Sequence, residues 1–176
     1  MYLGSFRGDT EYDLLLLLHI LTAIVGFGAV FLNAIYGAQT RARPGPEGLA
    51  IAQANFLVGK IAEYFIYAVF ILGVLLVLLS DDAWSFGDTW IWLSIVLYLV
   101  GIGLSHGILT PNVKRMIALM QEMVSMGPPP QGATGAGPPP QAAELEQRGQ
   151  RVGLTGATLN VLLVLILYLM VFQPGA

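Results

Sequence analysis

The chain has 176 residues, of which 56% are hydrophobic and 11% are charged, and its formal net charge is −3. An ordinary soluble domain carries about 25% charged residues, so this composition indicates a membrane protein. Cysteine is absent, which excludes disulfides, thiolate metal sites and cysteine nucleophiles. The sequence has no basic stripe, and we expect no nucleic-acid partner.

Four apolar stretches follow one another along the chain. They cover residues 12–37, 56–80, 90–109 and 154–172. Each reaches or approaches the roughly 20 residues that cross a bilayer as a helix. We therefore predict an all-α fold, a polytopic membrane protein in which residues 1–176 form a single four-transmembrane-helix bundle.

Small and polar residues recur at steps of three and four within the first stretch. They are His19, Thr22, Gly26, Ala29, Asn33 and Gly37. At about 100° per residue, these positions share one face of a helix. Small residues allow a neighbouring helix to approach closely, and polar ones find partners across the contact. The pattern predicts a helix-packing face, with a ligand-binding face around His19 as the alternative.

Residues 110–126, TPNVKRMIALMQEMVSM, place apolar and charged side chains on opposite faces of a helix. They predict a cytoplasmic amphipathic helix that continues from the third span with a bend near Pro111. Its methionines are interpreted as apolar packing rather than as Cu(I) ligands, and we predict no metal site. Residues 127–141 contain the pentapeptide GPPPQ twice, which predicts a flexible, disordered Pro/Gly linker. Residues 142–152 then predict a short helix that leads into the fourth span.

Basic residues fall in two of the three connections. Arg41, Arg43 and Lys60 follow the first stretch, and Lys114, Arg115, Arg148 and Arg151 lie between the third and the fourth. The turn over residues 80–89 carries acids and no base. The positive-inside rule places both basic regions in the cytoplasm. We expect a multi-pass protein of the bacterial plasma (inner) membrane with both termini outside.

Each predicted span contributes one polar side chain near its inner end. These side chains are Asn33, Glu63, His106 and Asn160, and Lys60 lies three residues before Glu63. The helical rise places them within roughly 5 to 10 Å of the inner surface. A carboxylate inside a membrane is costly unless it is paired or protonated. We expect Glu63 to pair with His106 or Lys60, either as a proton-coupled site or as a structural ion pair.

The segment LHILTAIVGFGAVF, residues 18–31, resembles the first helix of a group of small bacterial four-helix membrane proteins. The group includes predicted integral membrane proteins of unknown function, copper-resistance D-type domains and haem-dependent protoporphyrinogen oxidases. Leu18, His19, Ala23 and Gly28 fit its pattern, and Gly26 stands where tryptophan is expected. In the haem-dependent branch, the resemblance implies an axial haem b ligand at His19 and an important lysine on a later helix. Lys60 is at the wrong depth for that role.

The sequence supports three functions. The favoured one is an integral membrane protein of unknown function that is non-enzymatic, needs no cofactor and has a structural or interaction role. Its partners would be the lipid bilayer and either a second copy or another membrane protein. The alternatives are a haem-binding or redox protein that uses His19, and a small proton-coupled transporter that uses Glu63 and His106. No catalytic motif is present, and we expect His19 to donate a hydrogen bond to Ser94 or Tyr98.

Overall fold

The computed structural model describes residues 10–127 and 140–175. Within these ranges the chain is helical: α1 (Thr10–Ala42), α2 (Pro46–Leu78), α3 (Thr89–Leu104), the π-helix η1 (Ser105–Leu109), α4 (Thr110–Met126) and α5 (Pro140–Phe172). The segments α3, η1 and α4 follow one another without a break. Together they count as one helix. With α1, α2 and α5, they make four helices that are long and apolar enough to cross a membrane. The prediction of an all-α chain with four spans is confirmed.

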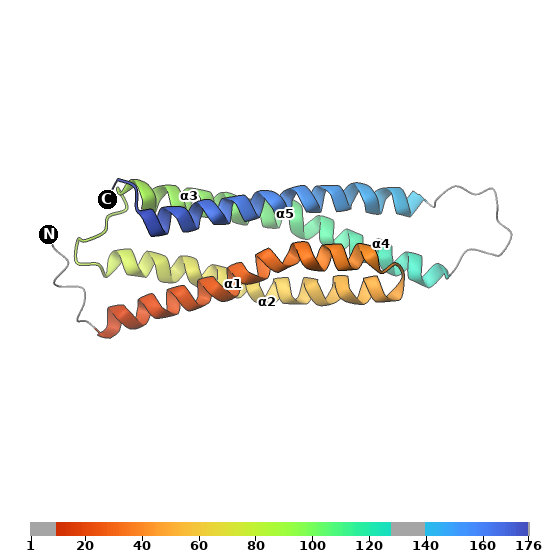
Figure 1. The fold of residues 1–176 in the computed structure, drawn as a ribbon, viewed down its shortest axis with the longest axis horizontal. Coiled ribbons are helices and arrows are strands. Elements are labelled where there is room, and N and C mark those ends of the chain that lie inside the picture. The colour runs from red at the N-terminus through yellow and green to blue at the C-terminus, as the bar shows by residue number, and fades with distance from the viewer. Residues whose placement is uncertain (1–9, 128–139, 176) are drawn as a thin grey trace.

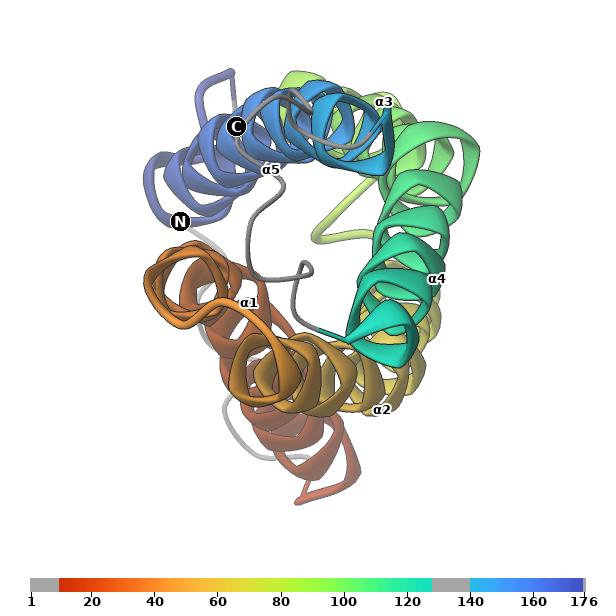
Figure 2. The same cartoon turned by 90° about the vertical axis from the view of Figure 1, so that its right-hand side faces the viewer.

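The helices run up and down around a ring (Figures 1 and 2). α1 packs against α2 and α5, while α4 packs against α2 and α5 and α3 packs against α5. The start of α1, the turn between α2 and α3, and the end of α5 lie at one end of the bundle (Figure 1). The bundle therefore consists of two helical hairpins, α1–α2 and α3/α4–α5, that meet along two seams.

The helices are longer than a membrane requires. α1, α2 and α5 have 33 residues each, which corresponds to about 50 Å of helix, whereas the hydrocarbon core is about 30 Å thick. The apolar stretches occupy residues 12–37, 56–80 and 154–172 of these helices. The additional turns therefore lie at the end that carries the Lys and Arg residues, opposite the α2–α3 turn.

The polar stripe of α1 faces protein, as predicted. All six of its residues are half-buried or buried, whereas Ile24 and Ile35 on other faces are 66% and 59% exposed. A Cβ added to Gly26 would lie 3.2 Å from the backbone nitrogen of Ile66 on α2. Gly26 therefore allows α1 and α2 to approach closely.

The middle of the bundle is filled by side chains from α2, α3 and α5. Val69, Tyr98 and Ile166 form a buried cluster, and the ring of Phe70 stacks on that of Tyr98 with 5.4 Å between centroids. The Tyr98 hydroxyl donates a hydrogen bond to the backbone carbonyl of Ile66. This bond satisfies a polar group that would otherwise be costly inside the bilayer.

The bend after the third span is formed by a π-helix. The sequence predicted a bend near Pro111, and η1 occupies the five residues Ser105–Leu109 just before it. Proline has no N–H to donate, and its ring clashes with the carbonyl of the preceding turn. A wider turn relieves this clash and continues the helix. The π-helix also contains His106.

The connection into the fourth span differs at its boundary from the prediction. Most of the predicted linker, residues 128–139, lies outside the described residues. Its last two residues, Pro140 and Gln141, already belong to α5. Proline is well suited to the first turn of a helix, where an N–H has no intrahelical acceptor. The helix predicted over residues 142–152 is continuous with the span that follows.

Candidate functional site

Glu63 is the centre of a polar network between α2 and η1. One carboxylate oxygen, Oε2, accepts a hydrogen bond from Lys60 Nζ at 2.6 Å. The other, Oε1, accepts one from the Tyr67 hydroxyl at 2.7 Å and lies 2.7 Å from His106 Nε2. The Tyr67 hydroxyl is also 2.8 Å from His106 Nε2. Glu63, Tyr67 and His106 therefore form a closed triangle of polar contacts.

Helical spacing brings these groups together. Lys60, Glu63 and Tyr67 are separated by three and four residues, so they share one side of α2. His106 comes from the π-helix, and its Nδ1 lies 3.0 Å from the Ile102 carbonyl four residues earlier. This second contact holds the imidazole ring in place while Nε2 faces Glu63.

The contacts of His106 fix the orientation of its ring. A carbonyl oxygen only accepts, so Nδ1 is placed to donate to Ile102. Nε2 lies within hydrogen-bond distance of Glu63 Oε1 and of the Tyr67 hydroxyl, and the hydroxyl can donate to either of them. Through this nitrogen, His106 connects η1 to α2.

The network is only partly buried. The Glu63 side chain is 23% exposed, and those of Lys60 and His106 are both 43% exposed. Lys60, three residues nearer the basic end of α2, reaches this carboxylate with its ammonium group. This arrangement fits a charge cluster near the membrane boundary, where the cost of a charge is smaller than at the bilayer centre.

The structure brings together three of the five residues of the predicted cluster: Lys60, Glu63 and His106. Asn33 is half-buried in the stripe of α1 and makes no hydrogen bond with this network. Asn160 on α5 has a buried side-chain oxygen without a hydrogen-bond partner in residues 10–127 and 140–175. Similar depth did not bring the asparagines into contact with Glu63, because their side chains are short and belong to other helices.

Tyr67 is the member of the network that the sequence did not indicate. It lies in a long apolar run, where a tyrosine is usually interpreted as core or lipid-facing. Its position four residues after Glu63 was the available signal, since such a pair shares one face of a helix.

A family model described as predicted integral membrane protein (DUF2269) matches residues 13–174, nearly the whole chain. The chain belongs to this family. No curated protein and no solved structure matches it. This DUF2269 protein is thus an integral membrane protein, in agreement with the four apolar helices.

His19 of the DUF2269 chain lies against α2 rather than α3. A Cβ added to Gly73 would be 3.1 Å from His19 Cε1. His19 Nδ1 is buried and makes no hydrogen bond of good geometry, although the backbone of Val69 lies near the ring. The predicted partners are wrong, because Ser94 donates to the Trp90 carbonyl and Tyr98 to the Ile66 carbonyl. Within the described residues, the backbones of α1 and α3 do not come close to each other, so the donor on His19 does not meet either hydroxyl.

Gly73 leaves room for the His19 ring on this side of α2, since a larger residue there would place its Cβ against the ring. Lys60, the lysine considered for the haem-dependent resemblance, contacts Glu63 instead of His19. The resemblance to the haem-dependent branch therefore gains no support from Lys60.

Proposed function

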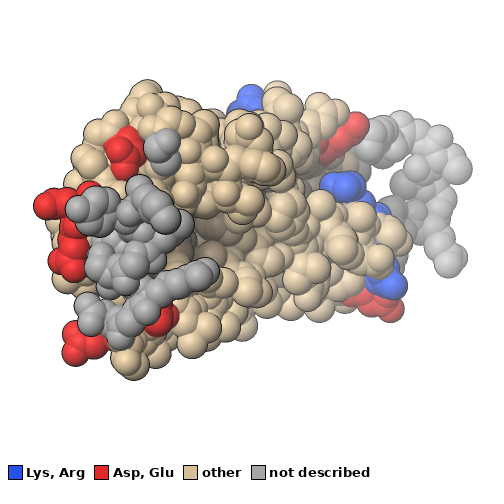
Figure 3. Space-filling view, turned by 60° about the vertical axis from the view of Figure 1, so that its left-hand side comes forward, with Lys and Arg blue, Asp and Glu red and all other residues tan. Residues whose placement is uncertain are grey.

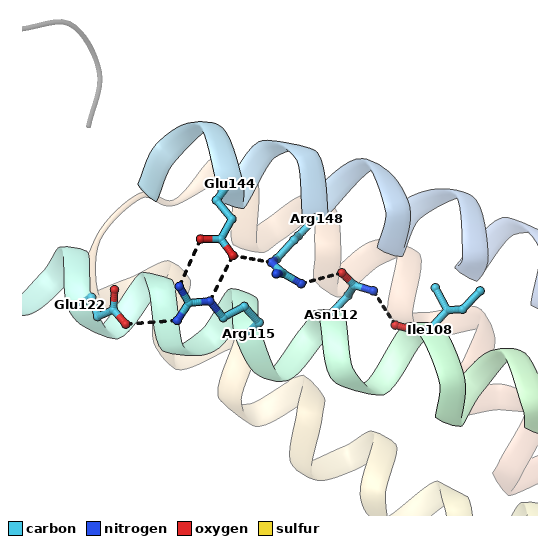
Figure 4. A network of polar contacts seen from close by, with 6 residues as sticks. All are labelled: Ile108, Asn112, Arg115, Glu122, Glu144 and Arg148. Carbon is cyan, nitrogen blue, oxygen red and sulfur yellow. Dashed lines mark hydrogen bonds and ion pairs between the residues drawn. The ribbon is translucent and has the colours of Figure 1, made fainter. Parts of the chain in front are cut away.

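We propose that this DUF2269 protein is a non-enzymatic protein of the bacterial inner membrane that acts through interaction with other membrane proteins or with a second copy. The observation that carries the proposal is the extension of its helices beyond the bilayer at the basic end. There, the ion pair of Arg115 with Glu144 and the hydrogen bond from Arg148 to Asn112 join α4 to the first turns of α5 (Figure 4). A braced helical surface outside the lipid is suited to hold a partner.

The distribution of charge supports an orientation with this surface in the cytoplasm. The acids of the described residues at the end with the α2–α3 turn are Glu11, Asp13, Asp81, Asp82 and Asp88, and no Lys or Arg of residues 10–127 and 140–175 lies there (Figure 3). The basic residues Arg41, Arg43, Lys60, Lys114, Arg115, Arg148 and Arg151 lie toward the opposite end. By the positive-inside rule, both termini are then outside.

α4 completes the proposed cytoplasmic surface. Leu119 is fully buried, Met116 and Met120 are half-buried, and Lys114 and Gln121 are exposed. We interpret α4 as an amphipathic helix that covers the cytoplasmic end of the bundle, with its polar side available to a partner.

Because the sequence contains no cysteine, a single introduced cysteine can test this orientation directly. A single cysteine is introduced at Gln121 on α4 or at Asp82 in the α2–α3 turn, and intact cells are treated with a membrane-impermeant maleimide. The proposal expects labelling at position 82 and none at position 121 until the cells are opened. Labelling of position 121 in intact cells would reverse the orientation and remove the proposed cytoplasmic surface.

The interaction role is tested with the same variants. Oxidative crosslinking of the Gln121→Cys protein in membranes should give a defined dimer or a defined complex with another membrane protein. The Asp82→Cys protein serves as the control for random collision. Equal crosslinking of both variants, or none of either, would contradict the proposal.

A proton-coupled role is the second candidate, because Glu63 and His106 lie in contact and both side chains can bind a proton. Groups that gain and lose a proton could couple its movement to that of a solute. Proteoliposomes with an internal pH dye would test it. A solute-dependent pH change that disappears in Glu63→Gln would support this candidate, and equal signals in both proteins would exclude it.

The absence of a cofactor is part of the first proposal. An absorption spectrum of the purified protein tests it. A Soret band in the wild type that is lost in His19→Gln would contradict this part of the proposal and would favour the resemblance to the haem-dependent proteins.

A further inference from the structure

A groove opens between η1, α4 and α5 at the basic end of the bundle. It encloses about 450 Å³ and is lined by Gly107, Ile108, Asn112, Arg151, Leu154 and Thr155. A Cβ added to Gly107 would have no neighbour within 4 Å, so the glycine helps to leave the space open. The apolar stretch of α5 begins at Leu154. The groove therefore lies where the hydrocarbon meets the lipid headgroups.

Arg151 differs from the two other arginines of this region. Arg115 and Arg148 both donate to the carboxylate of Glu144, and Arg148 also reaches Asn112 (Figure 4). Arg151 is exposed and forms no ion pair or hydrogen bond within residues 10–127 and 140–175. Its guanidinium is thus an uncompensated cation at the edge of the groove.

Thr155 supplies a second free donor one helical turn deeper. The residue is only 8% exposed, and its hydroxyl makes no hydrogen bond with the part of the chain that the structure describes. Threonine on a helix usually donates to the carbonyl of the preceding turn. A hydroxyl on the groove lining without that bond is available to an acceptor inside the groove.

The groove lining also contains apolar side chains. Ile108 is 40% exposed and Leu154 is 73% exposed, and both residues belong to membrane-spanning stretches. A ligand that satisfies the whole groove therefore needs an anionic oxygen-rich head and an apolar chain. Basic pockets between transmembrane helices on the cytoplasmic side bind such headgroups.

We propose that this groove binds an anionic glycerophospholipid from the leaflet at the basic end. Arg151 and Thr155 donate to the phosphate oxygens, and an acyl chain lies along Ile108 and Leu154. The guanidinium is suited to this role because its planar fork donates two parallel hydrogen bonds to a phosphate. The site does not depend on the interaction role proposed above.

The test titrates the delipidated full chain in detergent with phosphatidylglycerol or with phosphatidylcholine of the same acyl chains, and counts bound lipid by native mass spectrometry. We expect phosphatidylglycerol to bind about fivefold more tightly, the effect of one basic residue near an anionic headgroup. Arg151→Gln should remove this preference. Lys114→Gln removes an exposed cation of α4 outside the groove lining, and it should retain the preference.

A second variant tests the groove without a change of charge. Gly107→Leu should fill the open space and weaken the binding of phosphatidylglycerol, while inorganic phosphate should not displace the lipid. Equal losses in Arg151→Gln and Lys114→Gln would indicate diffuse attraction and overturn the site. Unchanged binding in Arg151→Gln and Gly107→Leu would also overturn it, and displacement by inorganic phosphate would indicate a site for free anions instead.

Discussion

The structure contains two charge networks of similar composition in different surroundings. One joins α2 to η1 through Glu63 and His106, within the apolar part of the bundle. The other joins α4 to α5 through Glu144, which accepts from Arg115 at 3.1 and 3.2 Å and from Arg148 at 2.8 Å (Figure 4). Each network ties the second half of the chain to a neighbouring helix.

We infer from this comparison that the contribution of an ion pair to stability depends more on its surroundings than on the number of its contacts. Around Glu63, a broken contact leaves a polar group in the apolar stretch of α2, where water replaces the lost partner less readily. Around Glu144, water replaces any lost partner, and exposed pairs contribute little. We therefore expect the α2–η1 network to hold the bundle together and the α4–α5 network to set the position of exposed helices.

Glu63→Ala should give the largest effect. It leaves the Tyr67 hydroxyl and His106 without their shared acceptor, and we expect the free energy of unfolding in a lipid bilayer mimic to fall by about 2 kcal/mol. Glu47→Ala is the control, since Glu47 is an exposed acid in the first turn of the same helix. Equal effects of the two substitutions would show that the network does not stabilise the bundle.

Tyr67→Phe should have about half that effect. It removes only the hydroxyl, which contacts both Glu63 and His106, and an interhelical hydrogen bond in a membrane contributes about 1 kcal/mol. Tyr64→Phe is a matched control because Tyr64 is 75% exposed on the same helix. The free energy of unfolding should fall more in Tyr67→Phe than in Tyr64→Phe. A larger loss in Tyr64→Phe would contradict this ranking.

The loss of the Glu144 charge should give the smallest effect on stability, and this effect should depend on pH. Hydrogen bonds from Arg115 and then from Arg148 lower the pKa of Glu144. A carboxyl group with a lowered pKa in the folded state stabilises that state above its ordinary pKa, and this contribution disappears as the pH falls through the lowered value. Acid should therefore loosen the α4–α5 contact below about pH 4.5.

Hydrogen exchange of α4 and the first turns of α5 as a function of pH would measure this loosening. Glu144→Gln should remove the acid dependence, whereas Glu146→Gln, at an exposed position two residues later, should keep it. A protein whose α4–α5 exchange is the same at all pH values would show that Glu144 does not brace the two helices.

Much of the fold could be predicted because hydrophobic length and helical period are properties of the local sequence. The four spans and the packing face around Gly26 follow from these two signals. The close contact of Glu63 with His106 was also predictable, because an intramembrane carboxylate needs a partner at its own depth.

The rest depends on how helices are arranged around the ring, which local patterns do not specify. Equal depth suggested Asn33 and Asn160 as members of the cluster, and Ser94 or Tyr98 as partners of His19, but depth leaves the neighbour of each helix undetermined. The π-helix was missed because Pro111 indicates a bend without specifying its form. Tyr67 was missed because an aromatic residue in an apolar run is usually interpreted as packing.

A pair of double-mutant cycles tests the comparison of the two networks most directly. The first combines Glu63→Gln with His106→Gln, and the second combines Glu144→Gln with Arg115→Gln. The free energy of unfolding is measured in bilayers at low salt and at about 0.5 M salt, where the screening length is about 4 Å. We predict a coupling of about 1 kcal/mol for the first pair that salt does not change, and a smaller coupling for the second that salt removes. A coupling between Glu63 and His106 that is lost in salt, or that is no larger than that between Glu144 and Arg115, would contradict the account.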